Sequence, residues 1–510
     1  MSKENQKIRT RFAPSPTGFV HIGNFRTALF SFLFARHNGG VHVLRVEDTD
    51  QNRQVEGSIE NLLQVMGELG VEFDEGFYLN DGILKERGNF GPYLQSERLE
   101  LYQKYALELV ESQEAYYCFC DEQRLEDLRK EQIALKKPPM YDRHCRYLSK
   151  QEVQEKLTEF KASGKNPVIR QAIPEDGQTV VSDLVYGEMV FDHKILDDQV
   201  LLKSDGFPTY HLAVVVDDHT MEISHVIRGE EWISSTPKHI LLYKALGWQP
   251  TLFAHLPLIL NPDKSKLSKR QGDVSVENFL AKGYLKEALV NFVAFLGWNP
   301  KTEQEIFSLP DLVSQFDLAK VNKAPAIFDL NKLDWLNGLY IRQMNLENLT
   351  EQLLPYWKEA GVNAEKFAKE YLESIAALER ERLKKLSEIG ERTKYFFEAP
   401  KGENYKGILV GKNSNPKATE AGLDKLINCL QDFYDPDFTK EVLEKKVKDF
   451  IADNNLSNND VLWPMRVALT GLSASPNPFE VASVLSLGLG KEEVLKRLKQ
   501  ALIQAQYLAK

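Results

Sequence analysis

Two short segments of the chain carry groups suited to binding phosphate. The first reads Pro-Ser-Pro-Thr-Gly-Phe-Val-His-Ile-Gly-Asn and runs from Pro14 to Asn24. Its glycines, Gly18 and Gly23, let the backbone approach a nucleotide without a Cβ in the way. The backbone N–H groups at the start of a following helix favour a bound anion, and His21 can donate a hydrogen bond to a phosphate oxygen as charge develops there. The alternative is a proline-rich turn before a core helix.

The second segment is Lys264–Arg270, which follows the turn Asn261–Asp263. It holds four cationic side chains in seven residues, with small hydroxyl side chains between them. Such a loop can clamp a triphosphate and a leaving pyrophosphate. A solvated basic loop is the usual alternative for a charge run on its own. The two segments together indicate nucleotide chemistry more strongly than either alone.

The elements around the first segment predict an α/β fold. A strand is expected over Ile8–Ala13, and apolar residues at helical spacing predict a helix from Ile22 to Arg36. The sequence Asn38-Gly39-Gly40 ends that helix, and Val41–Val46 is a second expected strand. Strand, tight loop, helix and strand form a parallel βαβ unit with a right-handed crossover.

A similar alternation returns after residue 199. Strands are expected over Gln199–Lys203, Glu222–Arg228 and Leu252–Leu260, with a helix that starts at Thr236-Pro237 and ends at Gly247. The segment between the two halves has its own cysteines. We therefore expect a nucleotide-binding sheet that is interrupted by an inserted domain.

The pattern becomes helical beyond about residue 345. Long amphipathic stretches appear, such as Glu365–Phe397 and Lys440–Ala452, with breaks near 411–416 and 454–459. The predicted organisation is a split catalytic domain, an inserted domain, a segment with the lysine loop and a helical C-terminal region. Their predicted ranges are 1–95 with 204–260, 96–203, 261–345 and 346–510, respectively.

Composition restricts the class of protein. The 510 residues are 43% hydrophobic and 27% charged, as in ordinary globular proteins, and a chain of this length needs several domains. Met1–Lys7 lacks the apolar run of a signal peptide, no stretch has the length of a membrane span, and four cysteines are too few for a disulfide scaffold. We expect a cytoplasmic protein. The net charge of −10 argues weakly against a nucleic-acid partner, but such binding depends on local basic patches.

The two phosphate-binding segments resemble the His-Ile-Gly-His and Lys-Met-Ser-Lys-Ser signatures of class I aminoacyl-tRNA synthetases. Here they read His21-Ile22-Gly23-Asn24 and Lys266-Leu267-Ser268-Lys269-Arg270. Several further stretches are similar to the glutamyl branch of that family, in the family's order, and they are Arg11–Gly18, Arg45–Asp50, Ser204–His211 and Val226–Trp232. Asn24 stands in place of the final histidine and removes one imidazole from the expected site.

The resemblance implies a Rossmann-like catalytic domain with an inserted domain and a helical anticodon-binding region. It also implies ATP-dependent activation of L-glutamate, with Mg²⁺, and transfer of the glutamate to tRNA(Glu) by a monomer. The implied catalytic residues are His21, Lys266 and Lys269. The implied ATP-binding residues are Pro14, Gly18, His21, Gly23, Asn24, Trp232, Lys266, Ser268 and Lys269.

The chemistry of the substrate suits the residues that the resemblance assigns to it. Arg11 and Arg228 offer planar donors for carboxylates, Glu47 can take the ammonium group, and Tyr210 adds a hydroxyl. The complete expected glutamate set is Arg11, Ala13, Ser15, Glu47, Tyr210 and Arg228. Val214 stands where the family often has a further polar residue. Each arginine can instead be a structural ion-pair partner. Two arginines near the substrate disfavour glutamine, whose amide brings an unneeded donor.

Three of the four cysteines lie close together in the sequence. Cys118-Phe119-Cys120 is followed by Cys145-Arg146-Tyr147, which suggests a structural zinc site. The family pattern puts the fourth ligand at Tyr147, although Tyr141 or His144 can serve instead. Ordinary buried thiols are the alternative.

Three other functions share some of these features. A shorter paralogue that loads glutamate onto a modified tRNA base lacks the helical C-terminal region. A nucleotidylyltransferase of the same fold lacks the set Arg11, Glu47 and Arg228. An RNA-binding scaffold descended from a synthetase would be expected to lose His21 or the lysine loop, and the sequence retains both. Near the C-terminus, Leu462–Gly471 resembles a stretch of the family's anticodon-binding region.

Overall fold

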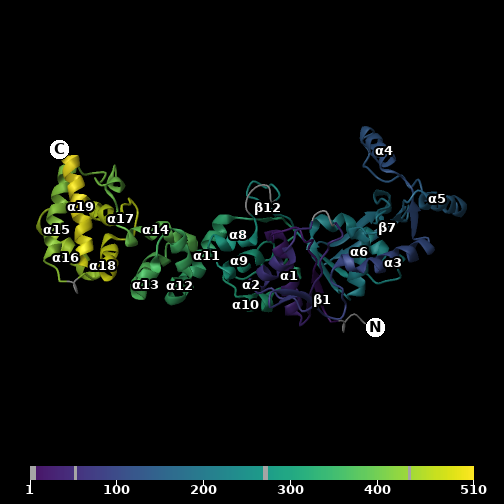
Figure 1. Cartoon of the computed structure of the whole chain (residues 1–510), viewed down its shortest axis with the longest axis horizontal. Coiled ribbons are helices and arrows are strands. Elements are labelled where there is room, and N and C mark those ends of the chain that lie inside the picture. Colours follow the sequence, from purple (N-terminus) through teal and green to yellow (C-terminus); the bar gives the residue numbers. More distant parts are fainter. Residues whose placement is uncertain (1–6, 51–53, 268–273, 435–437) are drawn as a thin grey trace. The chain divides into compact units, whose positions relative to one another are not determined.

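The computed structural model describes residues 7–50, 54–267, 274–434 and 438–510 (Figure 1). Within these ranges the chain divides into two compact units. The first takes the described residues up to Leu280 and Lys286–Leu330, and the second takes Ala281–Leu285 and Asn331–Lys510. Among the described residues, no helix combines the length and the apolar character needed to cross a membrane.

A six-stranded sheet forms the centre of the first unit. Its order is β2-β1-β10-β11-β7-β8, and each neighbouring pair is parallel except the hairpin of β7 and β8. The strands are β1 (Arg9–Phe12), β2 (Val41–Leu44), β7 (Gln178–Asp183), β8 (Gly187–Asp192), β10 (His225–Gly229) and β11 (Leu252–Leu256). The parallel strands β2, β1, β10 and β11 are almost entirely buried, as parallel strands between helices usually are.

The predicted βαβ unit is confirmed. Strand β1 leads through the proline-rich loop into α1 (Ile22–His37), and β2 then pairs with β1 in parallel register. Helix α1 is apolar on most of its circumference because it packs on β1 and also against α9 (Lys286–Ala294) and α10 (Leu309–Gln315). Figure 1 shows α1, in purple, beside the teal α9, although more than 200 residues separate them in the sequence.

The second half of the sheet differs from the expectation in two places. The expected strand over Leu252–Leu260 is divided at Pro257 into β11 and β12 (Ile259–Leu260), because proline cannot donate to a continuous ladder. The expected strand Gln199–Lys203 forms as β9 (Val200–Leu202), but it pairs with β6 and not with the main sheet.

The inserted segment contributes to two sheets. Strands β5 (Ala115–Cys118), β6 (Val168–Gln171) and β9 form an antiparallel sheet in the order β5-β6-β9. Strands β7 and β8, which also lie within 96–203, extend the main sheet. The other elements of this unit include α2 (Ser58–Glu68), β3 (Gly76–Asn80), β4 (Ile83–Arg87), α3 (Leu99–Glu111), α4 (Glu122–Ala134), α5 (Lys150–Ala162), α6 (Tyr210–Thr220), α7 (Thr236–Ala245), α8 (Val276–Ala281) and β13 (Ala326–Ile327).

The second unit is helical in its described residues, as the sequence predicts. Its α-helices are α11 (Leu330–Gln343), α12 (Leu346–Glu359), α13 (Lys369–Arg380), α14 (Ile389–Phe397), α15 (Pro416–Gln431), α16 (Lys440–Asp453), α17 (Asn458–Thr470), α18 (Pro478–Leu489) and α19 (Lys491–Ala509). The stretch 365–397 is divided between α13 and α14, and the predicted breaks near 411–416 and 454–459 fall between helices. Helix α15 packs on both α17 and α19.

Candidate active site

A cleft of about 760 Å³ opens at the carboxyl ends of β1 and β10. In an open parallel sheet, this edge is where ligands bind. All six residues of the expected glutamate set line the cleft, together with Pro14, Asn24 and Trp232 of the expected ATP set. Residues more than 200 positions apart in the sequence are thus brought together, because β1 and β10 are neighbours in the sheet.

Arg11 and Glu47 belong to a buried ionic network at one side of the cleft. The Nε of Arg11 donates to Asp218 Oδ1 at 3.1 Å, and Nη1 of the buried Arg45 donates to the same oxygen at 2.7 Å. Arg45 also donates to Glu47 Oε1 at 3.1 Å and lies 3.6 Å from Asp217. Burial raises the pKa of Asp218, but the charges of Arg11 and Arg45 outweigh it and hold that pKa below its usual value.

The nearby arginines stabilise the negative charge of Glu47 less than they stabilise that of Asp218. Burial raises the pKa of its carboxyl group above the ordinary value, against the opposing charges of Arg45 and Arg11. A cation that entered the cleft beside Glu47 would therefore be stabilised, because it would favour the ionised carboxylate.

Arg228 lies in a different environment at the end of β10. Its Nε donates to His255 Nε2 at 3.1 Å, Nη1 donates to the hydroxyl of Tyr210 at 3.0 Å, and Nη2 donates to Thr236 Oγ1 at 2.9 Å. His239 Nδ1 lies 3.4 Å from Nη1. Among the described residues no carboxylate forms an ion pair with Arg228, so its hydrogen bonds go to neutral groups. A buried cation without a counterion favours an anionic ligand.

The two imidazoles beside Arg228 stay neutral. Burial lowers the pKa of His255, the hydrogen bond to Asp183 opposes this, and the charge of Arg228 lowers it further. Burial likewise lowers the pKa of His239 well below its ordinary value, with Arg228 adding to the effect. Each histidine can therefore offer an unprotonated ring nitrogen to the guanidinium group.

Tyr210 completes the polar wall of the cleft. Its ring lies 4.1 Å from the ring of Trp232, centroid to centroid, at 33°. Because its oxygen accepts a hydrogen bond from Arg228, its own O–H remains available to donate to a ligand. Burial raises the pKa of Tyr210, so the hydroxyl keeps its proton at neutral pH.

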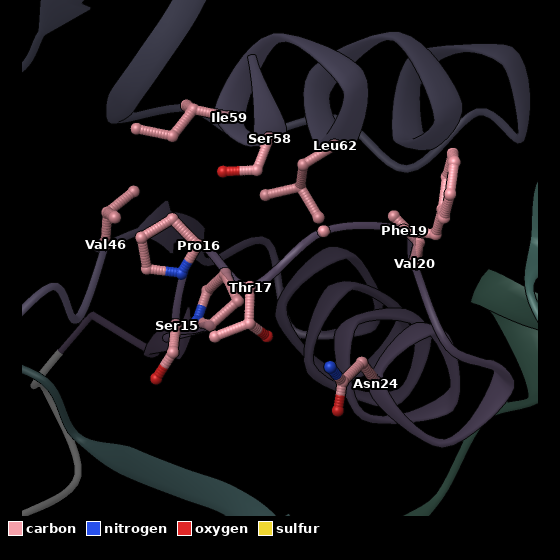
Figure 2. Close-up of a pocket in the computed structure, with 12 residues that line it drawn as sticks. Ser15, Pro16, Thr17, Phe19, Val20, Asn24, Val46, Ser58, Ile59 and Leu62 are labelled. Atoms are coloured by element: carbon pink, nitrogen blue, oxygen red, sulfur yellow. The ribbon is translucent and has the colours of Figure 1, made fainter. Parts of the chain in front are cut away.

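The proline-rich loop lies between α1 and α2. Figure 2 shows Ser15, Pro16 and Thr17 on the loop, with Ile59 and Leu62 of α2 on one side and Asn24 of α1 on the other. Gly18 has a φ of +105°, a conformation that favours glycine.

His21 is the residue that precedes the first turn of α1. Its Nδ1 accepts a hydrogen bond from the N–H of Gly23 at 3.0 Å. In the neutral imidazole, the proton is then on Nε2, which is the arrangement needed for donation to a phosphate oxygen. Neither His21 nor the glycines Gly18 and Gly23 line the 760 Å³ cleft itself.

Backbone hydrogen bonds join the histidine segment to residues that follow the lysine segment. The N–H of Ile22 donates to the carbonyl of Val274 at 3.1 Å, and the N–H of Val276 donates to the carbonyl of Val20 at 2.9 Å. Lys266 is exposed and pairs with Leu260 across the turn after β12. The expected ATP residues Ser268 and Lys269 lie outside the described residues.

Sequence reasoning missed the residues that hold the cleft in shape. Asp217 and Asp218 are two buried acids that directly follow the apolar run Leu212–Val216 in helix α6, and that contrast is a signal in the sequence itself. Asp183 and His255 carry no such local signal, because the bond between them joins residues 72 positions apart. Thr236 lies only eight residues after Arg228, but its place at the start of α7 indicated a helix boundary and not a contact with the guanidinium group.

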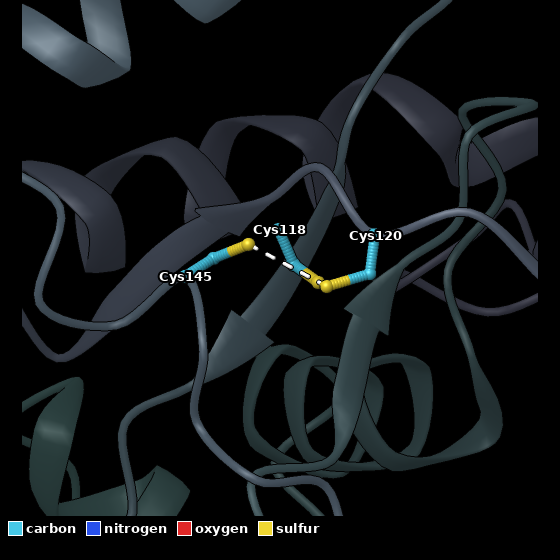
Figure 3. A group of neighbouring side chains, drawn as sticks. All are labelled: Cys118, Cys120 and Cys145. Carbon is cyan, nitrogen blue, oxygen red and sulfur yellow. Dashed lines mark hydrogen bonds between the residues drawn. The ribbon is translucent and has the colours of Figure 1, made fainter. Parts of the chain in front are cut away.

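The three cysteines of the inserted segment gather as predicted. The sulfurs of Cys118, Cys120 and Cys145 all lie within 4.8 Å of one another, and those of Cys120 and Cys145 are 3.6 Å apart (Figure 3). The hydroxyl of Tyr141 lies 3.3 Å from the sulfur of Cys118 and 3.4 Å from that of Cys120. Tetrahedral zinc with bonds of about 2.3 Å to sulfur and 2.0 Å to oxygen needs separations of roughly 3.5–3.8 Å between ligand atoms. The donor set therefore fits zinc.

The prediction of Tyr147 as the fourth ligand is not supported by the geometry. Tyr147 is 68% exposed and its hydroxyl bonds to Glu175, whereas Tyr141 is buried against the sulfurs. In an extended segment, residues two apart face the same side. Here the chain turns, with the N–H of Arg146 donating to the carbonyl of Arg143, and the side chain of Tyr147 points elsewhere. His144 is exposed and is not part of the cluster among the described residues.

The sequence matches two known families over most of its length. Residues 7–335 match the catalytic domain of class I tRNA synthetases (E and Q), and residues 348–502 match an anticodon-binding domain. A glutamate–tRNA ligase of Alkaliphilus metalliredigens is 45% identical over 500 residues, covering 97% of this chain and 98% of the relative. One of Clostridium tetani is 44% identical over 494 residues, covering 97% of each chain.

A solved structure has the same fold. The glutamate tRNA ligase from Elizabethkingia meningosepticum, crystallised in complex with its amino acid, superposes with a TM-score of 0.84 at 35% identity. The match covers 98% of this chain and 99% of that one.

Proposed function

The chain belongs to the glutamate–tRNA ligases, the class I synthetases that join glutamate to tRNA, and we propose that the cleft at β1 and β10 is its site for glutamate and ATP. The observation that carries this proposal is the guanidinium group of Arg228. It is buried, it faces the cleft, and its described partners are neutral. A carboxylate supplies the missing counterion.

The other charges of the cleft fit the rest of the amino acid. Glu47 binds the α-ammonium group of glutamate, because the negative charge of its carboxylate is not fully balanced by Arg45 and Arg11. Arg11 uses its Nε–H for Asp218 and lines the cleft. N–H groups on its terminal nitrogens donate to a carboxylate of the ligand. We assign the side-chain carboxylate of glutamate to Arg228 and Tyr210, because both groups donate there and neither is already paired with an anion.

The first chemical step is formation of the mixed anhydride. An α-carboxylate oxygen of glutamate attacks the α-phosphorus of ATP, which enters as its Mg²⁺ complex, and the bond to the pyrophosphate oxygen breaks. The Nε2–H of His21 donates to the phosphate oxygens as their charge grows, and Lys266 and Lys269 stabilise the leaving pyrophosphate. The products are glutamyl-adenylate and pyrophosphate, and no enzyme nucleophile is needed.

The second step transfers the glutamyl group to tRNA(Glu). A hydroxyl of the terminal ribose attacks the adenylate carbonyl, and the bond from this carbonyl carbon to the phosphate oxygen breaks. AMP leaves with the electron pair of that bond, and the hydroxyl proton passes to the phosphate group of AMP. The helical region that matches the anticodon-binding family selects the tRNA. We expect tRNA to be required before the first step, and the enzyme to work as a cytoplasmic monomer.

The cysteine cluster is proposed as a structural zinc site. Cys118, Cys120 and Cys145 would supply three thiolates, and Tyr141 would supply the fourth ligand in place of Tyr147. Zinc, when bound, ties the end of β5 to the segment that contains Cys145 and has no part in the chemistry of the cleft.

The test of this function is aminoacylation with labelled glutamate and ATP, on purified tRNA(Glu) and on tRNA(Gln) separately. Labelled glutamine serves as the matched substrate control. The proposal expects charging of tRNA(Glu) with glutamate and none with glutamine, and the result with tRNA(Gln) shows whether one or both tRNAs are accepted. A folded protein that charges neither tRNA with glutamate would exclude the proposed function.

A further inference from the structure

Arg228 is held by side chains that do not touch the cleft. Strands β10 and β11 are parallel neighbours, and their register places His255 directly beside Arg228. His255 is fully buried and lines no part of the cleft wall, yet its Nε2 accepts the hydrogen bond from Arg228 Nε at 3.1 Å.

The other nitrogen of His255 is fixed by Asp183 at the end of β7. The distance from Nδ1 to Asp183 Oδ2 is 2.7 Å, and the same oxygen accepts the backbone N–H of His255 at 3.1 Å. The second oxygen of Asp183 accepts the N–H groups of Val185 and Tyr186, both at 2.9 Å. An acceptor at Nδ1 leaves one neutral tautomer, in which Nδ1 carries the proton and Nε2 accepts from Arg228.

Thr236 holds the other end of the guanidinium group. Its hydroxyl donates to the carbonyl of Trp232 at 3.0 Å, so its lone pair is directed to Nη2 of Arg228 at 2.9 Å. With Tyr210 and His239 accepting from Nη1, four of the five guanidinium N–H groups are used. The described residues supply no acceptor for the remaining N–H on Nη2, so it is available to a ligand, and the hydroxyl of Tyr210 lies 3.0 Å from the neighbouring Nη1.

We propose that His255, locked by Asp183, and Thr236 are positioning residues that fix the Arg228 guanidinium so that the cleft selects a carboxylate over a carboxamide. The inference rests on the proposed function, since it names how the same site recognises the end of glutamate. The two groups that can contact the ligand, the remaining Nη2–H of Arg228 and the O–H of Tyr210, are both hydrogen-bond donors. A carboxylate accepts from both, whereas the NH₂ of a carboxamide finds no acceptor there.

Two substitutions of His255 distinguish its hydrogen bond to Asp183 from its hydrogen bond to Arg228. His255→Asn can keep a donor for Asp183 but has no atom near Nε2, whereas His255→Gln can place its amide oxygen there to accept from Arg228. His225→Asn is the control, because His225 is a second buried histidine, on the neighbouring strand β10, and does not line the cleft.

The readouts are the KM values for glutamate and for ATP, and the ratio of kcat/KM for glutamate to that for glutamine. We expect His255→Asn to raise the glutamate KM about tenfold or more, because one hydrogen bond to a charged group is lost. The ATP KM should stay within about twofold of the wild type. The glutamate-to-glutamine ratio falls in parallel. His255→Gln and His225→Asn stay near the wild type.

A second pair of variants, at Thr236, tests the same inference if the histidine variants do not fold. Thr236→Ser retains the hydroxyl and is expected to behave as the wild type, whereas Thr236→Val removes it at equal size and raises the glutamate KM. An unchanged glutamate KM in folded His255→Asn or Thr236→Val, or an equal rise in both KM values, would overturn the inference. Absence of glutamate charging by the wild type would instead refute the proposed function.

Discussion

At the scale of single residues, the site depends on side chains with more than one partner. His21 is an example, because Nδ1 caps α1 through the N–H of Gly23, and we propose that Nε2 donates to the phosphate oxygens in the reaction. A single substitution to alanine removes both functions at once. A variant that preserves the cap is therefore needed to observe the chemistry by itself.

His21→Asn is that variant, since asparagine is a good N-cap and its side-chain oxygen can accept from the helix N–H. We expect both His21→Asn and His21→Ala to lower the rate of tRNA-dependent pyrophosphate exchange into ATP by a factor of about 100 or more. Only His21→Ala is expected to lose helix stability as well, by about 1 kcal/mol. Exchange at the wild-type rate in His21→Asn would show that the imidazole has no role in the reaction.

At the scale of elements, the inserted segment shows how far a motif can predict a ligand set. The spacing of Cys118, Cys120 and Cys145 is sufficient to predict the cluster. Which side chain can serve as the proposed fourth ligand depends on whether the chain is extended or turned around Cys145, and the sequence pattern does not specify this. Tyr141 thus lies against the sulfurs and Tyr147 points away.

The two tyrosines provide a matched test of the zinc site. We expect Tyr147→Phe to bind zinc as the wild type does, and Tyr141→Phe to bind it more weakly by about tenfold or more, through loss of one ligand. Zinc stoichiometry after dialysis against increasing chelator concentrations measures this. Equal retention in both variants would remove Tyr141 from the ligand set, and loss in Tyr147→Phe alone would restore the family pattern.

The packing of α15 on α17 sets a second element-level constraint. A Cβ added at Gly422 would lie 2.1 Å from the carbonyl oxygen of Asp460. We expect Gly422→Ala to force the helices apart and to destabilise the second unit by roughly 1–3 kcal/mol. At Gly402 in the same unit, a Cβ would meet only Gln504 at 3.7 Å, so Gly402→Ala is the control. Differential scanning calorimetry of both variants measures the effect, and equal unfolding temperatures would contradict the close contact.

At the scale of the whole molecule, several buried histidines couple stability to pH. Burial lowers the pKa of His42, the fully buried histidine of β2, from 6.5 to about 4. The folded chain keeps this ring neutral, while the unfolded chain takes up a proton below pH 6.5. The contribution of the neutral His42 ring to the free energy of unfolding is therefore fully present above pH 6.5. It is lost as the pH falls from 6.5 toward 4, and the loss is on the order of 3 kcal/mol for this group.

We expect His42→Asn, which retains a donor for the carbonyl of Glu72, to lose less thermal stability between pH 7.5 and pH 5 than the wild type does. His37→Asn, at the exposed end of α1, should show the wild-type loss. Unfolding temperatures of the three proteins at both pH values provide the comparison. An identical loss in all three would mean that His42 does not contribute to the acid sensitivity.

The sequence predicted the parts of this molecule that depend on residue type and local order. Arg11, Glu47 and Arg228 were identified by their charge within motifs, and the βαβ unit by its periodicity. The division of the expected strand at Pro257 has a local cause, the missing N–H of proline. The pairing of β9 with β6 and the contacts of Asp183 with His255 depend on strands distant in the chain. Local patterns do not specify which strands become neighbours, so these features required the structure.

The most direct test of the assigned glutamate site compares Arg228→Ala with the wild type in the KM values for glutamate and for ATP. We expect the glutamate KM to rise about 100-fold or more, because the only cation assigned to the side-chain carboxylate is lost, and the ATP KM to stay within about threefold of the wild type. An equal rise in both KM values would make Arg228 a structural residue and contradict the assignment of the cleft.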